Sequence, residues 1–370
     1  MAPGMLPEII FFDRSKKVTA FKFPISIERH RVKALSDKFT SRMSLRLQRE
    51  EFTLLMLLDL GAPEIVPDYP ILSVDDLADQ IAEVLNFFGA KVIFGLNALA
   101  GRTLQSGSAV GPWNSSNAES FICYTVRKNY SIAGWEFGNE LCGSGVGANV
   151  SADQYASDIA ALRNIFHDVY RGIRHKPLII APGGFYDANW FQEFVNKSGK
   201  SVDVVSHHIY NLGAGVDEHL IERILDPSYL DGVASTFSGL KNILQKSATK
   251  AKAWVGEAGG AYNNGHHLVS DAFVYSFWYL DQLGMSTVYD TRTYCRQSLV
   301  GGNYGLLNTS TFVPNPDYYR YQILNFIVEG CAACYCGLSH FSFQVSILQK
   351  NILCAHFTNS HIPFYHWLRV

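Results

Sequence analysis

The chain has 370 residues, 48% of them hydrophobic and 17% charged, so it can bury a sizeable core and is not disordered by composition. Its formal net charge is -2, which excludes a global basic surface for nucleic acid, so no nucleic-acid partner is expected.

No apolar run reaches the roughly 18 residues of a membrane-spanning helix, and the first residues lack the basic start and apolar core of a signal peptide. The sequence alone therefore predicts neither a transmembrane helix nor an export signal. Five N-x-S/T sequons weakly indicate a secretory origin instead: Asn114, Asn129, Asn149, Asn196 and Asn308.

The seven cysteines do not form a convincing metal pattern. Cys331, Cys334 and Cys336 lie close together, but no second C-x-x-C accompanies them, and the spacing to His340 and His356 fits no zinc site. We therefore expect no structural metal and no cofactor.

Helix and strand patterns alternate through the middle of the chain. Residues 73–89 read as a helix, with a capping pattern at Ser73 and Asp76, and a second helix is expected over 151–172, where Ser151 and Gln154 form a capping box. Strands are predicted at 91–97, 132–140, 177–184, 202–210, 252–260 and 285–294.

Several of these strands are nearly continuous apolar runs, which is typical of parallel strands covered on both faces. The alternation predicts an α/β protein, specifically a (β/α)8 TIM-type barrel. Six strands are counted where such a barrel has eight, and the strand-like residues 8–13 and 52–60 are candidates for the others. We expect a divergent N-terminal segment (1–80), a catalytic barrel core (81–320) and a divergent C-terminal tail (321–370).

Polar residues follow the apolar strands, at the C-terminal face of a barrel, where the active sites of such proteins lie. They include Glu140 in GWEFGNE and Glu257 in AWVGEAGG, 117 residues apart, or about three βα units. Two carboxylates facing each other across the barrel mouth are the working parts of a glycosidase, with one as nucleophile and the other as proton donor. Asn139 is placed to hydrogen-bond a sugar hydroxyl, and Glu136, inside the strand, is expected to make structural contacts.

Two other polar motifs, the histidine pair at 207–208 and the glycine-rich loop at 301–305, could also form binding sites. His207 and His208 suggest a metal site with Glu140 or Asp203, but adjacent strand residues point to opposite faces, so only one histidine could reach it. We favour one core histidine and one polar group that lines the site. The glycine-rich GGNYG at 301–305 does not match a dinucleotide-binding loop, but its backbone amides could approach an anionic sugar.

Long motifs in this chain closely resemble plant heparanase-like proteins of glycoside hydrolase family 79, the endo-β-glucuronidase/heparanase family. They include FGLNALAGRTLQSGSAVGPWN, GWEFGNELCGSGVG, SHHIYNLGAGVD, WVGEAGGAYNNG and CRQSLVGGNYGLLN, and the resemblance runs from about residue 81 to 320. It implies a (β/α)8 barrel with a β-sandwich, a retaining mechanism, Glu140 as acid/base and Glu257 as nucleophile. It also implies a glucuronide site lined by Asn97, Tyr210, Tyr262, Gly302, Asn303 and Tyr304.

The resemblance further implies a glucuronic-acid-containing glycoside or polysaccharide as partner. It also implies a secreted, vacuolar or lysosomal setting, with peripheral membrane association possible. Two family features are not found in this sequence: an RLGG-type motif before the matched region and sandwich strands after PNPDYYR. We therefore expect a chain truncated at both ends, and the alternative function is an inactive product that at most binds sugar.

Overall fold

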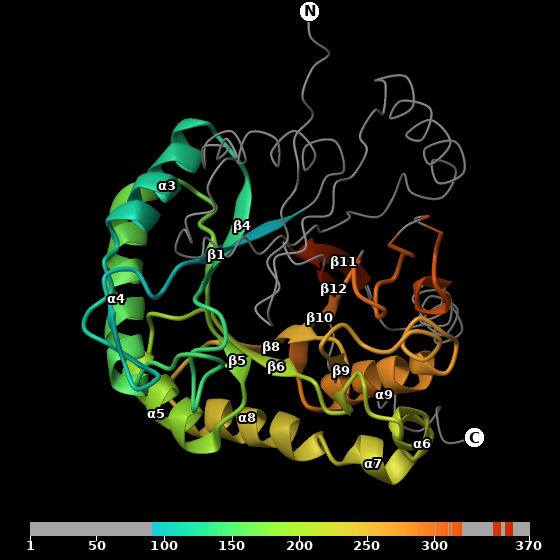
Figure 1. Cartoon of the computed structure of the whole chain (residues 1–370). Coiled ribbons are helices and arrows are strands. Elements are labelled where there is room, and N and C mark those ends of the chain that lie inside the picture. The colour runs from blue at the N-terminus through green and yellow to red at the C-terminus, as the bar shows by residue number, and fades with distance from the viewer. Residues whose placement is uncertain are drawn as a thin grey trace, which may run out of the picture. The chain divides into compact units, whose positions relative to one another are not determined.

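The computed structural model describes residues 91–299, 301–309, 311, 313–319, 343–348 and 352–357 (Figure 1). The expected helix at 73–89 and the strand-like residues 8–13 and 52–60 lie outside these ranges. So do the CAACYC cysteines and His340.

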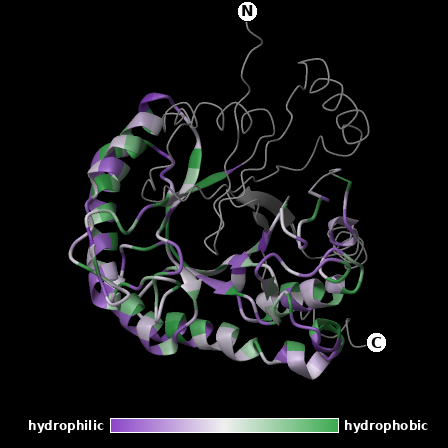
Figure 2. Ribbon diagram, in the orientation of Figure 1, coloured by the Kyte–Doolittle hydropathy of each residue, from purple (hydrophilic) through white to green (hydrophobic). Residues whose placement is uncertain are grey.

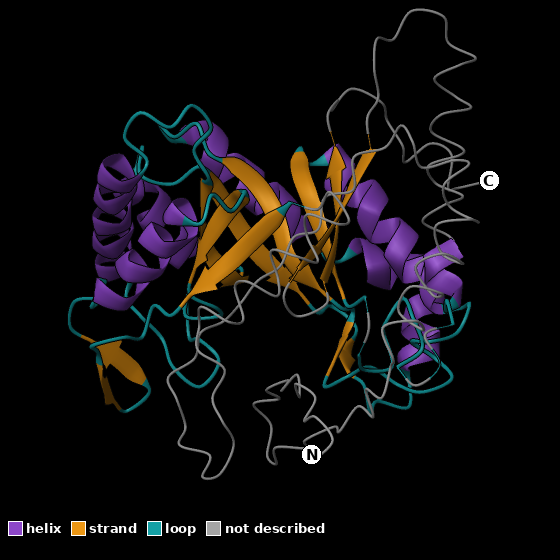
Figure 3. Ribbon diagram, turned by 90° about the horizontal axis from the view of Figure 1, so that it is seen from above, coloured by secondary structure: helices purple, strands orange, loops and turns teal. Residues whose placement is uncertain are grey.

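One sheet organises the described residues. Its strands, in spatial order, are β1 (Val92–Leu96), β4 (Ile132–Phe137), β5 (Leu178–Phe185), β6 (Val204–Ile209), β8 (Lys252–Ala258), β10 (Thr291–Gln297), β12 (Ile352–Phe357) and β11 (Phe343–Leu348). The six from β1 to β10 pair in parallel, whereas β12 pairs antiparallel with both β10 and β11. The sheet curls in Figure 3, and the backbone of β11 approaches that of β1.

Helices connect the parallel strands and lie outside the curved sheet (Figure 1). They are α3 (Ser116–Arg127), α4 (Ala152–Val169), α5 (Ala188–Ser198), α6 (Leu220–Leu225), α7 (Pro227–Asp231), α8 (Ala234–Lys246) and α9 (Tyr275–Val288). Two short strand pairs lie in the loops, β2 (Thr103–Gln105) with β3 (Ser108–Val110) and β7 (Gly213–Ala214) with β9 (Ala261–Tyr262). The predicted α/β class with a barrel-type arrangement is confirmed.

Local sequence explains the best-predicted helix, α4. The Ser151 hydroxyl accepts a hydrogen bond from the backbone N–H of Gln154, as the capping box predicts. Ile159, Leu162 and Phe166 then fall on one face and are fully buried. Hydrophilic and hydrophobic positions are likewise interleaved along the helices in Figure 2, as expected for helices with one buried face.

The sheet has an apolar core on both sides. Between sheet and helices lie large side chains such as Trp135, Phe137 and Phe191. On the inner side, the strands contribute a separate cluster: Ile93, Ile180, Val204, Trp254 and Cys295. Because both faces are covered, near-continuous apolar strands are stable here.

The prediction of a strand over 285–294 was wrong in its first half. Met285 to Val288 continue α9, and the strand begins at Thr291 after a turn in which Asp290 has φ +64°. Apolar residues surround much of α9, because it is buried on most sides, so its sequence shows little helical periodicity.

None of the helices in the described ranges is long and apolar enough to cross a membrane.

Candidate active site

Glu140 lies in a tight turn at the carboxyl end of β4. The strand ends at Phe137, and Gly138 follows at φ +74°, where an added Cβ would lie 2.6 Å from the Tyr155 hydroxyl oxygen. Glu140 itself has φ +56°, an unusual conformation for a residue with a side chain. Its N–H donates to the carbonyl of Gly183 at 2.6 Å, and its carbonyl accepts from the N–H of Val146 at 2.9 Å.

The neighbouring strand β5 packs directly against this turn. A Cβ on Gly184 would lie 2.6 Å from Cys142 Sγ and 3.0 Å from the Cα of Glu140. Glycine is therefore required there, because the two backbones approach too closely for any side chain.

Glu257 is the last residue but one of β8, inside the strand predicted over 252–260. The register between β6 and β8 shifts at this point, since His207 pairs with Val255 but His208 pairs with Glu257. A bulge of this kind changes the direction of a side chain. The Tyr210 hydroxyl donates a 2.6 Å hydrogen bond to Glu257 Oε1.

Tyr210 remains a donor because burial, followed by the negative charge of Glu257, raises its phenol pKa well above the ordinary value. The neutral phenol O–H is thus available to the carboxylate at every physiological pH.

The adjacent histidines of β6 have different environments, as the alternation of strand side chains predicts. His208 Nδ1 lies 3.0 Å from Glu140 Oε1. Burial alone would lower the pKa of His208, but the charge of Glu257 and the hydrogen bond with Glu140 outweigh it and raise that pKa. His207 instead packs edge-on against Phe237 in the outer core, where burial lowers its pKa to about 3.

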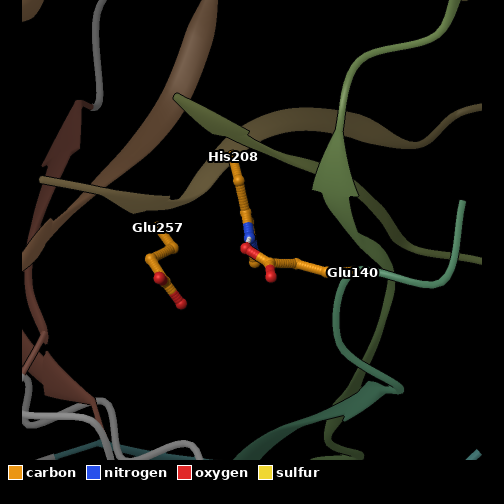
Figure 4. A group of neighbouring side chains, drawn as sticks. All are labelled: Glu140, His208 and Glu257. Carbon is orange, nitrogen blue, oxygen red and sulfur yellow. Dashed lines mark hydrogen bonds and ion pairs between the residues drawn. The ribbon is translucent and has the colours of Figure 1, made fainter. Parts of the chain in front are cut away.

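The side chains of Glu140, His208 and Glu257 converge on one point (Figure 4). One ligand-type atom from each lies within 4.8 Å of the others. The three residues come from β4, β6 and β8, so the parallel sheet brings the predicted carboxylate pair together at one edge.

Glu136, the other acid of GWEFGNE, lies deeper. Its side chain is buried and accepts a hydrogen bond from the Ser206 hydroxyl at 2.9 Å. This agrees with the structural contacts expected for it.

The remaining predicted residues lie on separate segments of the chain. Asn139 directly precedes Glu140, and Asn97 follows β1, where its side-chain oxygen accepts from the N–H of Leu99. Tyr304 is buried and close enough to Tyr210 to influence its pKa. Tyr262 lies in β9 with a half-exposed side chain.

The GGNYG loop is fixed against the loop that follows β9. The N–H of Asn303 donates to the carbonyl of Asn264 at 2.7 Å, and its carbonyl accepts from the Ser270 hydroxyl. An added Cβ on Gly302 would lie 3.0 Å from the Tyr304 ring. The backbone N–H of Asn303 is therefore already hydrogen-bonded within the protein.

Glu140, His208 and Glu257 could also hold a divalent cation, since two carboxylates and an imidazole are suitable ligands. Asp203, the other acid considered for this role, is paired with Arg163 at 2.7 Å instead. In the cluster, Glu140 Oε1 already faces His208 and Glu257 Oε1 already accepts from Tyr210.

Sequence reasoning did not identify two further residues near the site. Ser206, two positions before His208, faces inward with it because strand side chains alternate. Phe185 lies at the end of β5, 40% exposed, with its ring 6.3 Å from that of His208 and 6.2 Å from that of Tyr210. For Ser206, the available signal was its position two residues before His208 in a predicted strand.

A curled sheet of parallel strands, flanked by helices and carrying paired carboxylates at its strand ends, defines an α/β barrel-type protein with a hydrolase-like site. Residues 72–284 match the model of glycosyl hydrolase family 79, N-terminal domain, and the chain belongs to this family. The resemblance seen in the sequence motifs is thus confirmed.

The relatives agree with this assignment. The chain is 63% identical over 242 residues to heparanase-like protein 3 of Arabidopsis thaliana, covering 65% of this chain and 45% of the relative. It is 42% identical over 259 residues to baicalin-beta-D-glucuronidase of Scutellaria baicalensis (66% and 49%). It is 31% identical over 238 residues to heparanase of Gallus gallus (62% and 43%). The chain spans about half the length of the curated relatives it matches.

Proposed function

We propose that this chain is a retaining glycoside hydrolase in which Glu257 is the nucleophile and Glu140 is the acid/base. The observation that carries the proposal is the approach of the two carboxylates within 4.8 Å. Retaining glycosidases hold their carboxyl groups about 5 Å apart, whereas inverting enzymes leave about 6.5–9.5 Å for a water molecule.

The reaction follows from this spacing. Glu257 attacks the anomeric carbon while Glu140 protonates the leaving oxygen, which breaks the glycosidic bond and forms a glycosyl ester on Glu257. Glu140, now ionised, takes a proton from water, and the oxygen of that water displaces Glu257. Two inversions at the same carbon give retention of configuration.

Neighbouring side chains support these two roles. The Tyr210 hydroxyl donates to one oxygen of Glu257 and so fixes the orientation of this carboxylate. His208 contacts Glu140 and has a raised pKa, so it can keep a positive charge beside the carboxylate after proton donation.

The substrate class we propose is a β-glucuronide, either a glucuronic-acid-containing polysaccharide or a smaller glycoside. The support is the family membership, together with relatives that include a beta-D-glucuronidase and a heparanase. Tyr210, which donates to Glu257 and is close enough to Tyr304 for an electrostatic interaction, supports the predicted sugar-binding role of these two tyrosines.

The test is hydrolysis of an aryl β-D-glucuronide by the purified 370-residue chain, with the first released anomer identified by proton NMR. The β-anomer is expected, and Glu257→Gln should reduce turnover by at least about 10⁴-fold because it removes the nucleophile. Glu193→Gln, an exposed glutamate on α5, is the matched control and should retain full turnover.

An α-anomer as first product would contradict the retaining mechanism. Full turnover in Glu257→Gln would contradict the nucleophile assignment. Glucuronide binding without any turnover would favour the alternative, an inactive sugar-binding product.

A further inference from the structure

A buried carboxylate lies beneath the proposed catalytic pair and takes no part in the reaction described above. Glu136 is the last residue but one of β4, between Trp135 and Phe137, which both pack into the outer core. Strand side chains alternate, so Glu136 faces the inside of the curled sheet, where it is only 3% exposed.

A chain of hydrogen bonds runs from this carboxylate to the backbone of Glu140. The Ser206 hydroxyl donates to Glu136 Oε1 at 2.9 Å, and the N–H of Gly183 donates to Ser206 Oγ at 3.0 Å. The carbonyl of Gly183 in turn accepts the N–H of Glu140 at 2.6 Å. Three strands, β4, β6 and β5, are thereby linked directly below the turn that carries Glu140.

The same carboxylate oxygen also abuts the strand that carries Glu257. A Cβ added to Gly183 would lie 2.7 Å from Glu136 Oε1, and one added to Gly256 would lie 3.2 Å from it. Gly256 directly precedes Glu257, at the bulge of β8. Glu136 Oε1 thus fills the space between the two backbones that support the catalytic pair.

Packing alone does not explain a carboxylate at this position. The next layer inside the sheet is apolar and includes Ile93, Ile180 and Val204. A buried charge costs desolvation free energy, and an apolar side chain of similar volume is often neutral or stabilising in its place.

We propose that Glu136 is a positioning residue that holds the backbones under Glu140 and Glu257 at the separation required for the two-step reaction. It acts through Ser206 and Gly183 on the Glu140 side, and on the Glu257 side it occupies the space beside Gly256 that a Cβ there would enter. The catalytic consequence rests on the proposed function, whereas the hydrogen-bond chain does not.

Three variants separate the parts of this arrangement. Glu136→Gln keeps an acceptor oxygen for Ser206, Glu136→Leu removes the acceptor but keeps most of the volume, and Ser206→Ala breaks the chain while leaving Glu136 in place. The matched control is Ser276→Ala, which removes a similar buried bond, from the Ser276 hydroxyl to Asp317 Oδ1 at 2.7 Å, away from the site.

The first measurement is hydrogen–deuterium exchange at the amides of Glu140 and Gly183 in the full chain, which needs no activity. Glu136→Leu and Ser206→Ala should speed exchange there by about tenfold or more, because the bonds that protect these amides are weakened. Glu136→Gln should stay within about threefold of the wild type, since its amide oxygen still accepts. Ser276→Ala should leave both amides unchanged.

The second measurement is turnover of an aryl β-D-glucuronide with a good leaving group, with and without azide. Displacing Glu140 weakens its action as a base, a contribution of about 10²–10⁴-fold, so Glu136→Leu and Ser206→Ala should lose about tenfold or more in kcat. KM should fall together with kcat, because slower hydrolysis lets the glycosyl ester accumulate. Azide attacks the glycosyl ester without a base, so it should restore turnover in these two variants. Azide should not accelerate the wild type or Ser276→Ala. A variant that had only lost stability would not be rescued by azide, so rescue limited to Glu136→Leu and Ser206→Ala indicates a positioning role.

Unchanged exchange at Glu140 and Gly183 in both Glu136→Leu and Ser206→Ala would overturn the proposal. Faster exchange with unchanged kcat in an active chain would overturn the positioning role. If Glu136→Leu does not fold, Ser206→Ala and Glu136→Gln still decide the question. A wild-type chain with no turnover would contradict the proposed function alone, and the exchange measurement would still decide whether Glu136 holds these backbones.

Discussion

Glu140 and Glu257 reach the same point by different backbone devices. Glu140 adopts a left-handed conformation in a turn held by Gly183 and Val146, whereas Glu257 is directed inward by a register shift within β8. Each conformation is held by specific contacts with neighbouring strands. The geometry of this carboxylate pair therefore depends on residues such as Gly183 and Gly184, which have no side chain of their own.

The hydroxyl of Tyr210 should contribute directly to turnover. Tyr210→Phe removes the 2.6 Å hydrogen bond to Glu257 Oε1, and a bond to a charged group is worth about 1.5–3 kcal/mol, so kcat should fall about 10- to 100-fold. Steady-state kinetics on an aryl glucuronide measure this. Tyr229→Phe, which removes a hydroxyl bonded to the carbonyl of Asn211 near the surface, is the control and should have wild-type kinetics. Equal kinetics in both variants would show that the Tyr210 hydroxyl is dispensable.

His207 and His208 should give opposite dependences of stability on pH, although they are adjacent. The folded-state pKa of His208 is raised by Glu257 and Glu140 against burial. Its stabilisation is therefore fully present below the unfolded pKa of about 6.5 and is lost as pH rises through the folded pKa. The folded pKa of His207 is lowered to about 3, so stability falls as pH drops from about 6.5 toward 3, by about 1.4 kcal/mol per pH unit.

Urea unfolding of the wild type, His208→Gln and His207→Gln between pH 5 and 9 checks these signs. The stability advantage of the wild type over His208→Gln should shrink as pH rises. Its advantage over His207→Gln should shrink as pH falls. Parallel pH profiles for the two variants would contradict the assignment of the charged histidine to the site.

The sequence was informative at the residue scale where side chains follow strand ends. Glu140 could be singled out because a polar run interrupts an apolar strand. The inward direction of Glu257 could not be derived, because it depends on a register shift between β6 and β8. The link between Glu136 and Ser206 joins residues 70 positions apart and becomes visible only once the strands are paired.

At the scale of elements, α4 could be predicted closely because its cap and apolar stripe are both local signals. The boundary between α9 and β10 could not, because the helix is buried on most sides and its end contains Thr287 and Val288, residue types that favour strands. Burial of α9 against the rest of the fold therefore determines that Thr287 and Val288 are helical, which their local propensity does not predict.

A buried ion pair attaches residues 313–319 to the end of the parallel sheet. Arg296 on β10 pairs with Asp317 at 3.0 Å, and its guanidinium lies about 5 Å from the ring centroids of Tyr275, Trp278 and Tyr279 on α9. The pair therefore joins a strand, a helix and the segment that follows them.

Removing one partner of this pair should strongly destabilise the protein. Asp317→Ala leaves the buried Arg296 guanidinium without its counter-ion, so the free energy of unfolding should fall by about 3–5 kcal/mol. The exposed pair of Asp153 and Lys197 is the control, and Asp153→Ala should cost less than about 1 kcal/mol. Urea denaturation measures both. Similar costs for the two variants would mean that Arg296 regains solvent when Asp317 is lost.

At the scale of the whole molecule, the parallel barrel-type sheet could be predicted because apolar strands alternate with helices over more than 200 residues. The extension of that sheet could not, since residues 321–370 carry no clear turn or cap signals. Two strands from this region, β11 and β12, continue the sheet beyond β10. Without them, β10 would be the edge strand of the parallel sheet. Instead, β10 pairs with β12 in antiparallel register, from Thr293 opposite His356 to Gln297 opposite Ile352.

This pairing predicts a specific effect of shortening the chain. A chain ending at residue 319 leaves the backbone N–H and C=O groups of β10 unpaired on one side, and an unpaired edge strand exchanges faster and aggregates. Hydrogen exchange at residues 293–297 should therefore accelerate, whereas exchange in β4 and β5, at the other end of the parallel sheet, should change little. A chain ending at residue 357 retains both hairpin strands and is the control. If the two shortened chains have the same exchange at β10 and the same solubility, the antiparallel hairpin does not protect this edge, and the parallel strands are stable without it.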